Sequence, residues 1–368
     1  MSDTLTLPYA AAEARAPTKR IPVAVLGATG SVGQRFVQLL DGHPWFKLHE
    51  VVASERSAGK PYGEAADWRL DTLLLNDAAA LPVKSLGAEL QSRVIFSGLD
   101  SSVAGEAEDD YANRGCAVIS NARNHRMDAD VPLLIPELNA DHIGVIERQQ
   151  KRRGGHGYIV TNPNCSVVGL AMAIAPLERL YGIEQLHVTT MQAISGAGYQ
   201  GVASYAILDN VIPYIGGGEE EKIEAEPRKI LGRLEKDRFV DAPFRISAQV
   251  NRVPTIDGHL MTISLSLRNR NFVNVEQVRE AIDNFRGEPQ LLRLPSAPHK
   301  PLHYVAGDDR PQPRLDRDRE RGMSVSVGRL RPCPLLDLRM VALVHNTIRG
   351  AAGAAILNAE LLEAKGLL

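Results

Sequence analysis

The chain has 368 residues, of which 44% are hydrophobic, 23% charged and 5% aromatic, enough for two domains or for one large α/β body with an insertion. Its 42 Lys and Arg against 44 Asp and Glu leave a formal net charge of -2, which removes the electrostatic basis for a dedicated nucleic-acid or membrane-surface binder. No apolar run approaches the roughly 20 residues that cross a bilayer, and the N-terminus has no apolar signal segment. We therefore expect a cytoplasmic protein with a small or nucleotide-like partner.

The first half of the chain alternates short apolar runs with helical spacing. Residues 1–18 have no sustained apolar period, so we expect a mobile arm or an edge extension. The run 21–26 leads through a glycine-rich turn, 27–30, into apolar residues at helical spacing, which predicts a strand, a loop and a helix. Further parallel strands are predicted at 48–53, 93–96, 117–119 and 131–135. The first 160 residues are thus predicted to form a doubly wound sheet.

The second half predicts longer strands and fewer helices. The basic, glycine-rich segment 147–157 is predicted to be a surface loop before a strand at 158–161, and 166–180 is predicted to be a buried helix. The segment 296–321, rich in Pro, Arg and Asp, is expected to be functional or interfacial rather than core. An Ala-rich helix at 346–365 could pack back on the first domain. A mixed or antiparallel sheet is indicated by long strands at 186–194, 245–253, 260–267, 323–330 and 336–344.

A glycine motif follows the first predicted strand. Gly27, Gly30 and Gly33 stand at the start of the predicted helix, where backbone N–H groups can face a pyrophosphate. The spacing GxxGxxG is a variant of the usual dinucleotide fingerprint, so a tight turn that binds nothing is the alternative. The strand before the motif favours nucleotide binding.

The residues after the second predicted strand indicate which dinucleotide binds. An NAD-binding protein usually offers an acidic residue to the ribose hydroxyls there, whereas this chain has Ser54, Glu55, Arg56 and Ser57. A guanidinium flanked by hydroxyls suits a 2′-phosphate, which it can bind with two hydrogen bonds. The sequence favours NADP over NAD, with a solvated surface arginine as the alternative for Arg56.

Cys165 lies between a predicted strand and a predicted helix. A thiol at a helix N-terminus meets the positive end of the helix dipole, which predicts a lowered pKa and a reactive thiolate. Asn164 belongs to a predicted tight turn, and free N–H groups of the next helical turn could stabilise an oxyanion. The isolated Cys116 and Cys333 are interpreted as inert, buried thiols, and the wide spacing of the three cysteines predicts neither a disulfide framework nor a structural zinc site.

A cysteine nucleophile needs a partner that exchanges protons near neutral pH, and histidine is the usual one. Among ten histidines, His259 follows a predicted Asp257–Gly258 turn and opens a strand. Arg252 stands seven residues earlier and could hold a carboxylate near the same place. An ordinary strand-edge histidine is the alternative for His259.

Taken together, these residues resemble the aspartate-β-semialdehyde dehydrogenase family, and most of all its archaeal and fungal branch, from about Ile21 to the end. The blocks that match in order are GATGSVGQRF at 27–36, SNARNHRMD at 120–128, TNPNCSVVGL at 161–170, QAISGAGYQG at 192–201, GEEEKIEAE at 218–226, RVPTIDGHL at 252–260 and HNTIRGAAG at 345–353. The resemblance implies an α/β fold. Its parts would be a Rossmann-type NADP-binding domain at 1–160, an α+β catalytic and oligomerisation domain with a large mixed sheet at 161–345, and a C-terminal helix within 346–368 returning to the first domain.

The resemblance also implies roles for the matching residues. The residues that act on the acyl group or bind its charges would be the nucleophile Cys165, the acid/base His259, Gln192 and Asn164 beside the thiol, Arg252 and Glu219 for the aspartyl carboxylate and ammonium groups, and Arg126 and Lys222 for phosphate. The cofactor contacts would be Gly27, Thr29, Gly30, Ser31, Val32, Ser54, Arg56, Ser57, Ser195, Gly196 and Asn346. Glu219 and Lys222 are three residues apart near a predicted helix start and can share one face, although a solvated helix face is the alternative for this charged run.

The implied reaction is the reduction of L-aspartyl-4-phosphate by NADPH to L-aspartate-4-semialdehyde for lysine, threonine and methionine synthesis, without a metal. Malonyl-CoA reductase or another acyl-CoA or acyl-phosphate reductase is the alternative on this scaffold, because one thiolate attacks a thioester and a mixed anhydride alike. A non-enzymatic NADP-binding regulator is a further alternative, but it gives no reason for Cys165, His259 and Arg252 to coexist. The implied partners are the small-molecule substrate, phosphate and other copies of the chain in a homodimer or homotetramer.

Overall fold

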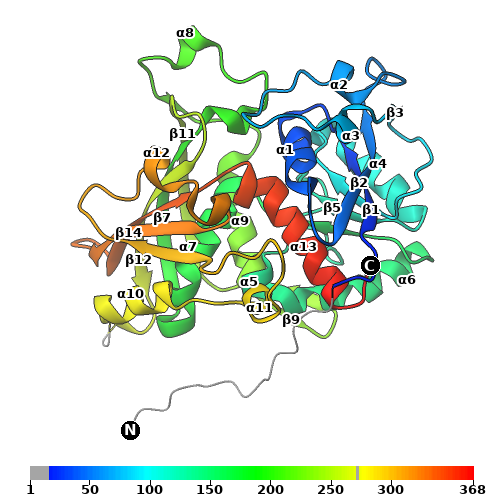
Figure 1. Cartoon of the computed structure of the whole chain (residues 1–368). Helices are drawn as coiled ribbons and strands as arrows, with labels where there is room; N and C mark the ends of the chain where they lie inside the picture. The colour runs from blue at the N-terminus through cyan, green and yellow to red at the C-terminus, as the bar shows by residue number, and fades with distance from the viewer. Residues whose placement is uncertain (1–15, 271–272) are drawn as a thin grey trace.

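The computed structural model describes residues 16–270 and 273–368. Residues 1–15 of the predicted N-terminal arm lie outside this range. Figure 1 shows two α/β bodies, coloured mainly blue to cyan and green to orange, with the red C-terminal helix running between them. No helix in the described part of the chain is long and apolar enough to span a membrane.

The first body is built on a parallel sheet, which among the described residues has six strands in the order β3-β2-β1-β4-β5-β6. Their bounds are β1 Ile21–Leu26, β2 Phe46–Ala53, β3 Val83–Ser85, β4 Val94–Ser97, β5 Ala117–Ser120 and β6 Tyr158–Thr161. The strand order runs one way from β1 and the other way from β4, so a crevice opens at the carboxyl ends of these two neighbours. The glycine turn 27–30 follows β1 at this crevice, and the predicted doubly wound domain is confirmed.

Helices cover both the sheet and the loops of this body. The first, α1, begins directly after Gly30 and buries Phe36, Val37 and Leu40 against the sheet, as its helical spacing predicts. The helical segments of this body are α1 Ser31–Leu40, α2 Tyr62–Ala65, α3 Asn76–Ala79, α4 Ser101–Asn113, α5 Pro136–Asn139, η1 Ala140–Val145 and α6 Ile146–Arg153.

Two predictions for this half are wrong. The segment 131–135 is not a ladder strand: Leu133 makes an isolated bridge with Thr161, and the flanking Pro132 has no N–H to extend the pairing. The predicted loop 147–157 contains most of α6, whose buried Ile146 and Gln149 anchor it. Basic residues in its last turn and Gly154, with a φ of 68° just after it, are the usual features of a helix C-terminus.

The second body is built on a mixed sheet, which in the described chain has seven strands in the order β13-β14-β15-β12-β7-β11-β8. Their bounds are β7 Ile183–Gln192, β8 Ile212–Pro213, β11 Arg245–Arg252, β12 His259–Leu267, β13 Leu302–Val305, β14 Val325–Pro332 and β15 Leu338–Val344, and a separate hairpin pairs β9 Arg233–Glu235 with β10 Arg238–Val240. The predicted mixed sheet is confirmed. The prediction for 296–321 is wrong in part, because this segment supplies β13, and Leu302 in it is fully buried.

The central helix of this body is α7, which is buried along most of its length and packs against β12 and β15. Its neighbour α9 packs on both α7 and β11. The helical segments here are α7 Cys165–Tyr181, η2 Ile194–Ala197, α8 Ser204–Ile207, α9 Glu219–Ile230, α10 Val275–Asp283, α11 Glu288–Leu291, α12 Pro313–Asp316 and η4 Arg319–Gly322. Helices α7 and α9 begin at the end of the sheet where strands β7 and β11 finish. Side chains from these four elements therefore meet at that end of the sheet.

The C-terminal segment begins with a π-helical turn, η5 Ile348–Ala352, and continues as α13 Gly353–Ala364, where the sequence predicts one uninterrupted helix. The apolar residues of α13 belong to the core of the first body, and the Tyr158 hydroxyl at the start of β6 donates to the carbonyl of Leu367 at 2.9 Å. The predicted return of the C-terminal helix to the first domain is confirmed.

Candidate active site

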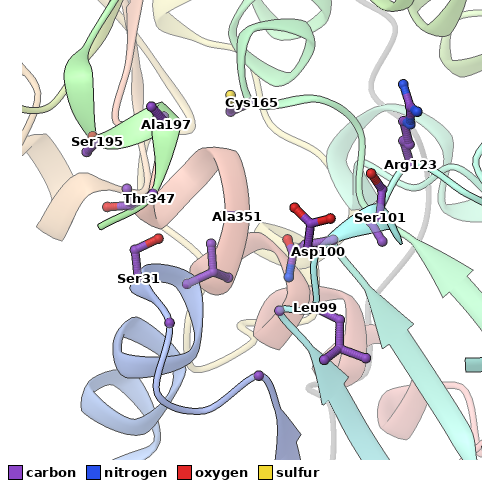
Figure 2. A pocket seen from close by; sticks show the side chains of 18 of the residues that line it. Ser31, Leu99, Asp100, Ser101, Arg123, Cys165, Ser195, Ala197, Thr347 and Ala351 are labelled. Atoms are coloured by element: carbon purple, nitrogen blue, oxygen red, sulfur yellow. The ribbon is translucent and has the colours of Figure 1, made fainter. Parts of the chain in front are cut away.

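A cavity of about 1050 Å³ lies where the first sheet, the starts of α1 and α7, and the loop around η2 meet. Figure 2 shows Ser31, Ser195 and Cys165 arranged around it, although they come from widely separated parts of the sequence. The predicted site residues that line this cavity are Gly27, Thr29, Gly30, Ser31, Val32, Ser54, Arg126, Asn164, Cys165, Gln192, Ser195, Gly196, Glu219, Lys222, Arg252 and Asn346.

Cys165 is the first residue of α7, and local hydrogen bonds fix its position. The side chain of Asn164 caps the helix by accepting from the backbone N–H groups of Ser166 and Val167, at 2.9 and 3.3 Å. On the other side the backbone of Gly350 passes so closely that a Cβ there would lie 2.9 Å from the Cβ of Cys165. The thiol is thus held at the cavity wall, with its Sγ 3.2 Å from Nε2 of His259.

The predicted lowering of the Cys165 pKa is wrong for the chain alone. Burial raises the pKa of the thiol to about 12, and the negative charge of Glu219 acts in the same direction. The guanidinium groups of Arg126 and Arg252 and the N–H of Ser166 oppose the shift without cancelling it. The loss of hydration outweighs the field of one helix terminus, so the thiol is neutral at pH 7.

His259 opens β12 and is fully buried behind the cysteine. Burial, with the nearby Arg252 and His345, lowers the pKa of the imidazole to about 3, so the ring is neutral at pH 7. Its Nδ1 accepts from the backbone N–H of Ala193 at 3.0 Å. In a neutral ring with an acceptor at Nδ1 the proton is on Nε2, which faces Sγ of Cys165. The histidine therefore presents a hydrogen-bond donor to the sulfur.

A charged cluster lies beside this pair at the ends of β7 and β11. Arg252 and Gln192 are opposite each other in the parallel pairing of these strands, and Arg252 donates from Nη1 to the carbonyl of Ala193 at 2.7 Å. Glu219, at the start of α9, accepts from Nε2 of Gln192 at 3.2 Å and from Nδ2 of Asn164 at 2.8 Å. The sheet register and two helix starts thus bring together residues that the sequence predicted as separate motifs.

Cationic side chains occupy the adjoining part of the cavity. Lys222 donates from Nζ to Oε2 of Glu219 at 3.2 Å, so the predicted shared helix face is present. Arg126 is mostly buried, donates from Nη2 to the carbonyl of Asn121 at 2.7 Å, and has no partner for its buried Nε among the described residues. Two cations beside a cysteine form a site suited to an anion such as phosphate.

The glycine loop has a conformation that requires glycine. Gly27 has a φ of +69°, and a Cβ there would lie 2.8 Å from the carbonyl oxygen of Gly98. A Cβ on Gly33 would lie 2.1 Å from the oxygen of Gly27. The turn can therefore pack closely on the strand and the helix, and it leaves the N-terminus of α1 open to the cavity, as a pyrophosphate site needs.

The other predicted cofactor residues occupy two places. Asn346 joins the loops at one end of the cavity by donating to Oγ of Ser195 at 2.8 Å and accepting from the N–H of Gly258 at 2.8 Å. A Cβ on Gly196 would lie 2.8 Å from Nη1 of Arg252, so a side chain at this position would displace the guanidinium. Arg56 and Ser57 do not line the main cavity but a second pocket of about 400 Å³ next to it, which Thr29 and Ser54 also line.

This second pocket contains basic residues that the sequence reasoning missed. Lys60 follows Arg56 by four residues in the same loop, so its positive charge could have been recognised in the sequence as part of the same site. Arg69 comes from a later segment, where Oδ2 of Asp67 accepts from its Nε at 2.8 Å and the ring of Tyr199 lies under its guanidinium, and no local pattern indicates it.

The two other cysteines differ from each other. Cys116 is buried, and burial raises the pKa of its thiol, in agreement with the predicted inert residue. The prediction of a buried Cys333 is wrong, because this residue is partly exposed. Burial alone would raise the pKa of the Cys333 thiol, but the N–H groups of Leu336 and Leu335, together with Ser264 and Arg339, lower it below its usual value.

The fold and the site define a class of protein: a dinucleotide-binding body joined to a cysteine–histidine pair is the arrangement of an oxidoreductase that works through a cysteine-bound acyl group. Two family models match the chain, "Semialdehyde dehydrogenase, NAD binding domain" at residues 22–146 and "Semialdehyde dehydrogenase, dimerisation domain" at 174–349.

Relatives narrow this class. The aspartate-semialdehyde dehydrogenase of Methanothermobacter thermautotrophicus is 49% identical over 93% of this chain and 99% of its own length, and that of Candida albicans is 48% identical over 94% and 98%. A crystal structure of aspartate semialdehyde dehydrogenase with NADP from Candida albicans matches with a TM-score of 0.88 at 45% identity, covering 95% of this chain and 100% of that chain. The chain belongs to the aspartate-semialdehyde dehydrogenase family.

Proposed function

We propose that this chain reduces L-aspartyl-4-phosphate to L-aspartate-4-semialdehyde with NADPH, the step that feeds lysine, threonine and methionine synthesis. The observation that carries the proposal is the 3.2 Å contact of Cys165 Sγ with the buried His259 Nε2, at the wall of a cavity that the glycine loop also lines. Membership of the family and the names of its close relatives support the same reaction.

The residues of the first body fit NADP. The open N-terminus of α1 after Gly30 suits the pyrophosphate, and Arg56 and Lys60 in the second pocket give a 2′-phosphate two cations. Ser195, Gly196 and Asn346 line the cavity near Cys165 and are assigned to the nicotinamide side. When bound, NADPH supplies the hydride.

Cys165 acts on the acyl phosphate as the nucleophile. Its sulfur bonds to the acyl carbon as the carbon–oxygen bond to phosphate breaks, and the thiol proton leaves with the phosphate as hydrogen phosphate. Arg126 and Lys222 bind this leaving group. The product is a thioester on Cys165, held beside Gln192 and Asn164.

His259 acts on the second half of the reaction. Hydride addition to the thioester places negative charge on the acyl oxygen, and the Nε2–H is positioned to donate a hydrogen bond to it. As the carbon–sulfur bond breaks, this oxygen forms the carbonyl of the aldehyde, and the released thiolate of Cys165 takes a proton from water. Arg252 binds the α-carboxylate with a planar pair of donors, and Glu219 binds the ammonium group. These roles select an aspartyl substrate over a plain aldehyde.

A coupled assay tests the proposed reaction and its nearest alternative. The purified chain is given NADPH with aspartyl phosphate or with malonyl-CoA, and the loss of NADPH absorbance is followed. We expect oxidation of NADPH with aspartyl phosphate and, in the reverse direction, phosphate-dependent NADPH formation from aspartate semialdehyde and NADP. A higher rate with malonyl-CoA would assign the chain to the acyl-CoA reductases instead.

The dimerisation model supports a homo-oligomer, and we propose a dimer or tetramer in the cytoplasm. The segment carrying α8 projects from the body of the chain in Figure 1, and Tyr205, Leu208 and Tyr214 on it are exposed apolar residues that a second copy would cover. Light scattering should report an oligomer, and Leu208→Asp should weaken it.

We further propose residues 1–160 as the NADP-binding domain and 161–345 as the catalytic domain, with the helix in 346–368 added to the first.

A further inference from the structure

One face of α9 carries a row of charged residues that points inward. Glu219, Lys222, Glu226 and Lys229 are spaced by three, four and three positions, which puts them on the same side of a helix. Glu226 and Lys229 are almost fully buried, with exposures of 2% and 3%. Charged side chains are rarely buried to this degree unless they are paired, so the partners of these two residues are informative.

The carboxylate of Glu226 has one partner on each oxygen. Oε1 accepts from Nη1 of Arg126 at 2.9 Å, and Oε2 accepts from the backbone N–H of Asn164 at 2.7 Å. Glu226 itself does not line the cavity, whereas Arg126, Asn164 and Cys165 do. The carboxylate therefore joins, from behind, the guanidinium assigned to phosphate and the residue that precedes the nucleophile.

The same helix fixes the backbone at Arg126 and in the residues that follow it. Lys229 donates from Nζ to the carbonyl oxygens of Arg126, Asp128 and Val131 at 2.8, 2.9 and 2.9 Å. Arg126 is thus held at its main chain by Lys229 and at its guanidinium by Glu226. Only the second contact also reaches the start of α7.

We propose that Glu226 is a positioning residue that holds the phosphate-binding guanidinium of Arg126 at a fixed distance from Cys165. Attack on an acyl phosphate needs the sulfur and the leaving phosphate to be held together, and a displacement of about 1 Å can cost on the order of 100-fold in rate. A single carboxylate with one oxygen on each group sets this distance. The proposal rests on the proposed function, because it concerns the phosphate of that reaction.

Glu226→Gln is the informative substitution, because it keeps the shape of the side chain but only one of its two acceptor oxygens. The amide offers one oxygen and one NH₂ group, and both partners, the guanidinium and the Asn164 N–H, are donors. One of the two contacts is therefore lost. Glu224→Gln is the matched control: Glu224 is on the same helix and its carboxylate also accepts from a backbone N–H, that of Ala248 at 3.0 Å, but it has no contact with Arg126.

The assay runs the reaction from aspartate semialdehyde, with phosphate and NADP varied separately. We expect Glu226→Gln to raise the KM for phosphate about tenfold or more and to leave the KM for NADP within about twofold, because a charge-assisted contact at the phosphate site is disturbed. Glu224→Gln should leave both values as in the wild type. Equal KM values for phosphate in the wild type and in Glu226→Gln overturn the proposal.

Further measurements distinguish loss of folding, general destabilisation and failure of the proposed function. If Glu226→Gln melts below the assay temperature, Glu226→Asp, which keeps the charge, is measured by the same criterion; a KM for phosphate equal to the wild type again overturns the proposal. A loss spread equally over phosphate and NADP also overturns it, because it indicates general destabilisation. A wild-type chain without phosphate-dependent NADPH formation refutes the proposed function itself, before any variant is made.

Discussion

Cys165 and His259 face each other as a neutral thiol and a neutral imidazole, because burial shifts their pKa values in opposite directions. An ion pair between them would need both groups to charge inside a desolvated site. The nearby charges instead set the fraction of thiolate: Arg126 and Arg252 favour it and Glu219 opposes it. The cysteine is therefore protected from reaction in the chain alone and depends on its neighbours for activation.

Replacing Cys165 by alanine should abolish turnover and preserve cofactor binding. The thiol supplies the covalent step, so we expect a loss of roughly a thousandfold or more in kcat. The Kd for NADP, measured by fluorescence titration, should stay within about twofold, because the glycine loop and the second pocket are untouched. Cys333→Ala is the control and should be as active as the wild type. A Cys165→Ala variant with activity within tenfold of the wild type would contradict the role of Cys165.

The pKa of Cys165 predicts how its alkylation depends on pH. Because the value is raised to about 12, the thiolate fraction and the rate of modification by iodoacetamide should rise about tenfold for each pH unit between pH 7 and 9. Glu219→Gln removes a negative charge that raises the pKa, so modification should be faster at each pH. Mass spectrometry of Cys165 in a Cys333→Ser background measures this. Slower modification in Glu219→Gln would show that Glu219 acts on the thiol in another way.

At the scale of elements, we propose that the cofactor specificity depends on the loop after β2. Ser54, Arg56 and Lys60 from this loop line the second pocket, which also touches the glycine loop at Thr29. A phosphate in this pocket would be bound by side chains, from this loop and from the later segment that carries Arg69, whereas the proposed pyrophosphate site uses backbone groups. The two sites are adjacent and chemically independent, so they can be altered separately.

Arg56→Ala should weaken NADP and leave NAD almost unchanged. The loss of one charge-assisted phosphate contact costs about 1.5–3 kcal/mol, roughly 10- to 150-fold in Kd. Lys60→Ala should show the same selectivity if the second pocket holds the phosphate. Titration of each variant with both dinucleotides measures the effect. An equal loss for NADP and NAD would show that Arg56 supports the loop structure instead.

The helices and strands that could be predicted from sequence are those whose own residues determine their structure. The apolar runs of β1 and β6 match the structure to the residue, since β6 and the last four residues of β1 are buried and both strands are bounded by polar or turn-forming residues. The site residues that could be predicted from sequence lie in motifs next to a strand end or a helix start, as Cys165 and His259 do. Glu226 and Arg69 could not be predicted in this way. Their contacts with Arg126 and Tyr199 span 100 and 130 residues, and only the folded chain brings these groups together.

At the scale of the molecule, α13 joins both bodies through a buried carboxylate. Glu360 accepts from the N–H and the hydroxyl of Ser296 and from Nε2 of His43 at 2.8 Å. The other nitrogen of His43 accepts from the N–H groups of Trp45 and Phe46, at the start of β2. One side chain thus connects the C-terminal helix, the turn before β2 and a segment of the second body.

Glu360→Ala should therefore loosen this junction. It leaves the buried His43 and the half-buried Ser296 without their acceptor, and a buried donor without an acceptor costs about 1–3 kcal/mol. We expect a lower Tm, together with faster hydrogen exchange in both α13 and the start of β2, because the two are joined through the same carboxylate. Glu363→Ala is the matched control on the same helix, since Glu363 is partly exposed and its side chain makes no hydrogen bond or ion pair in the described chain. Exchange that rises in α13 alone, or equally in both variants, would show that apolar packing holds the helix on the first body without help from Glu360.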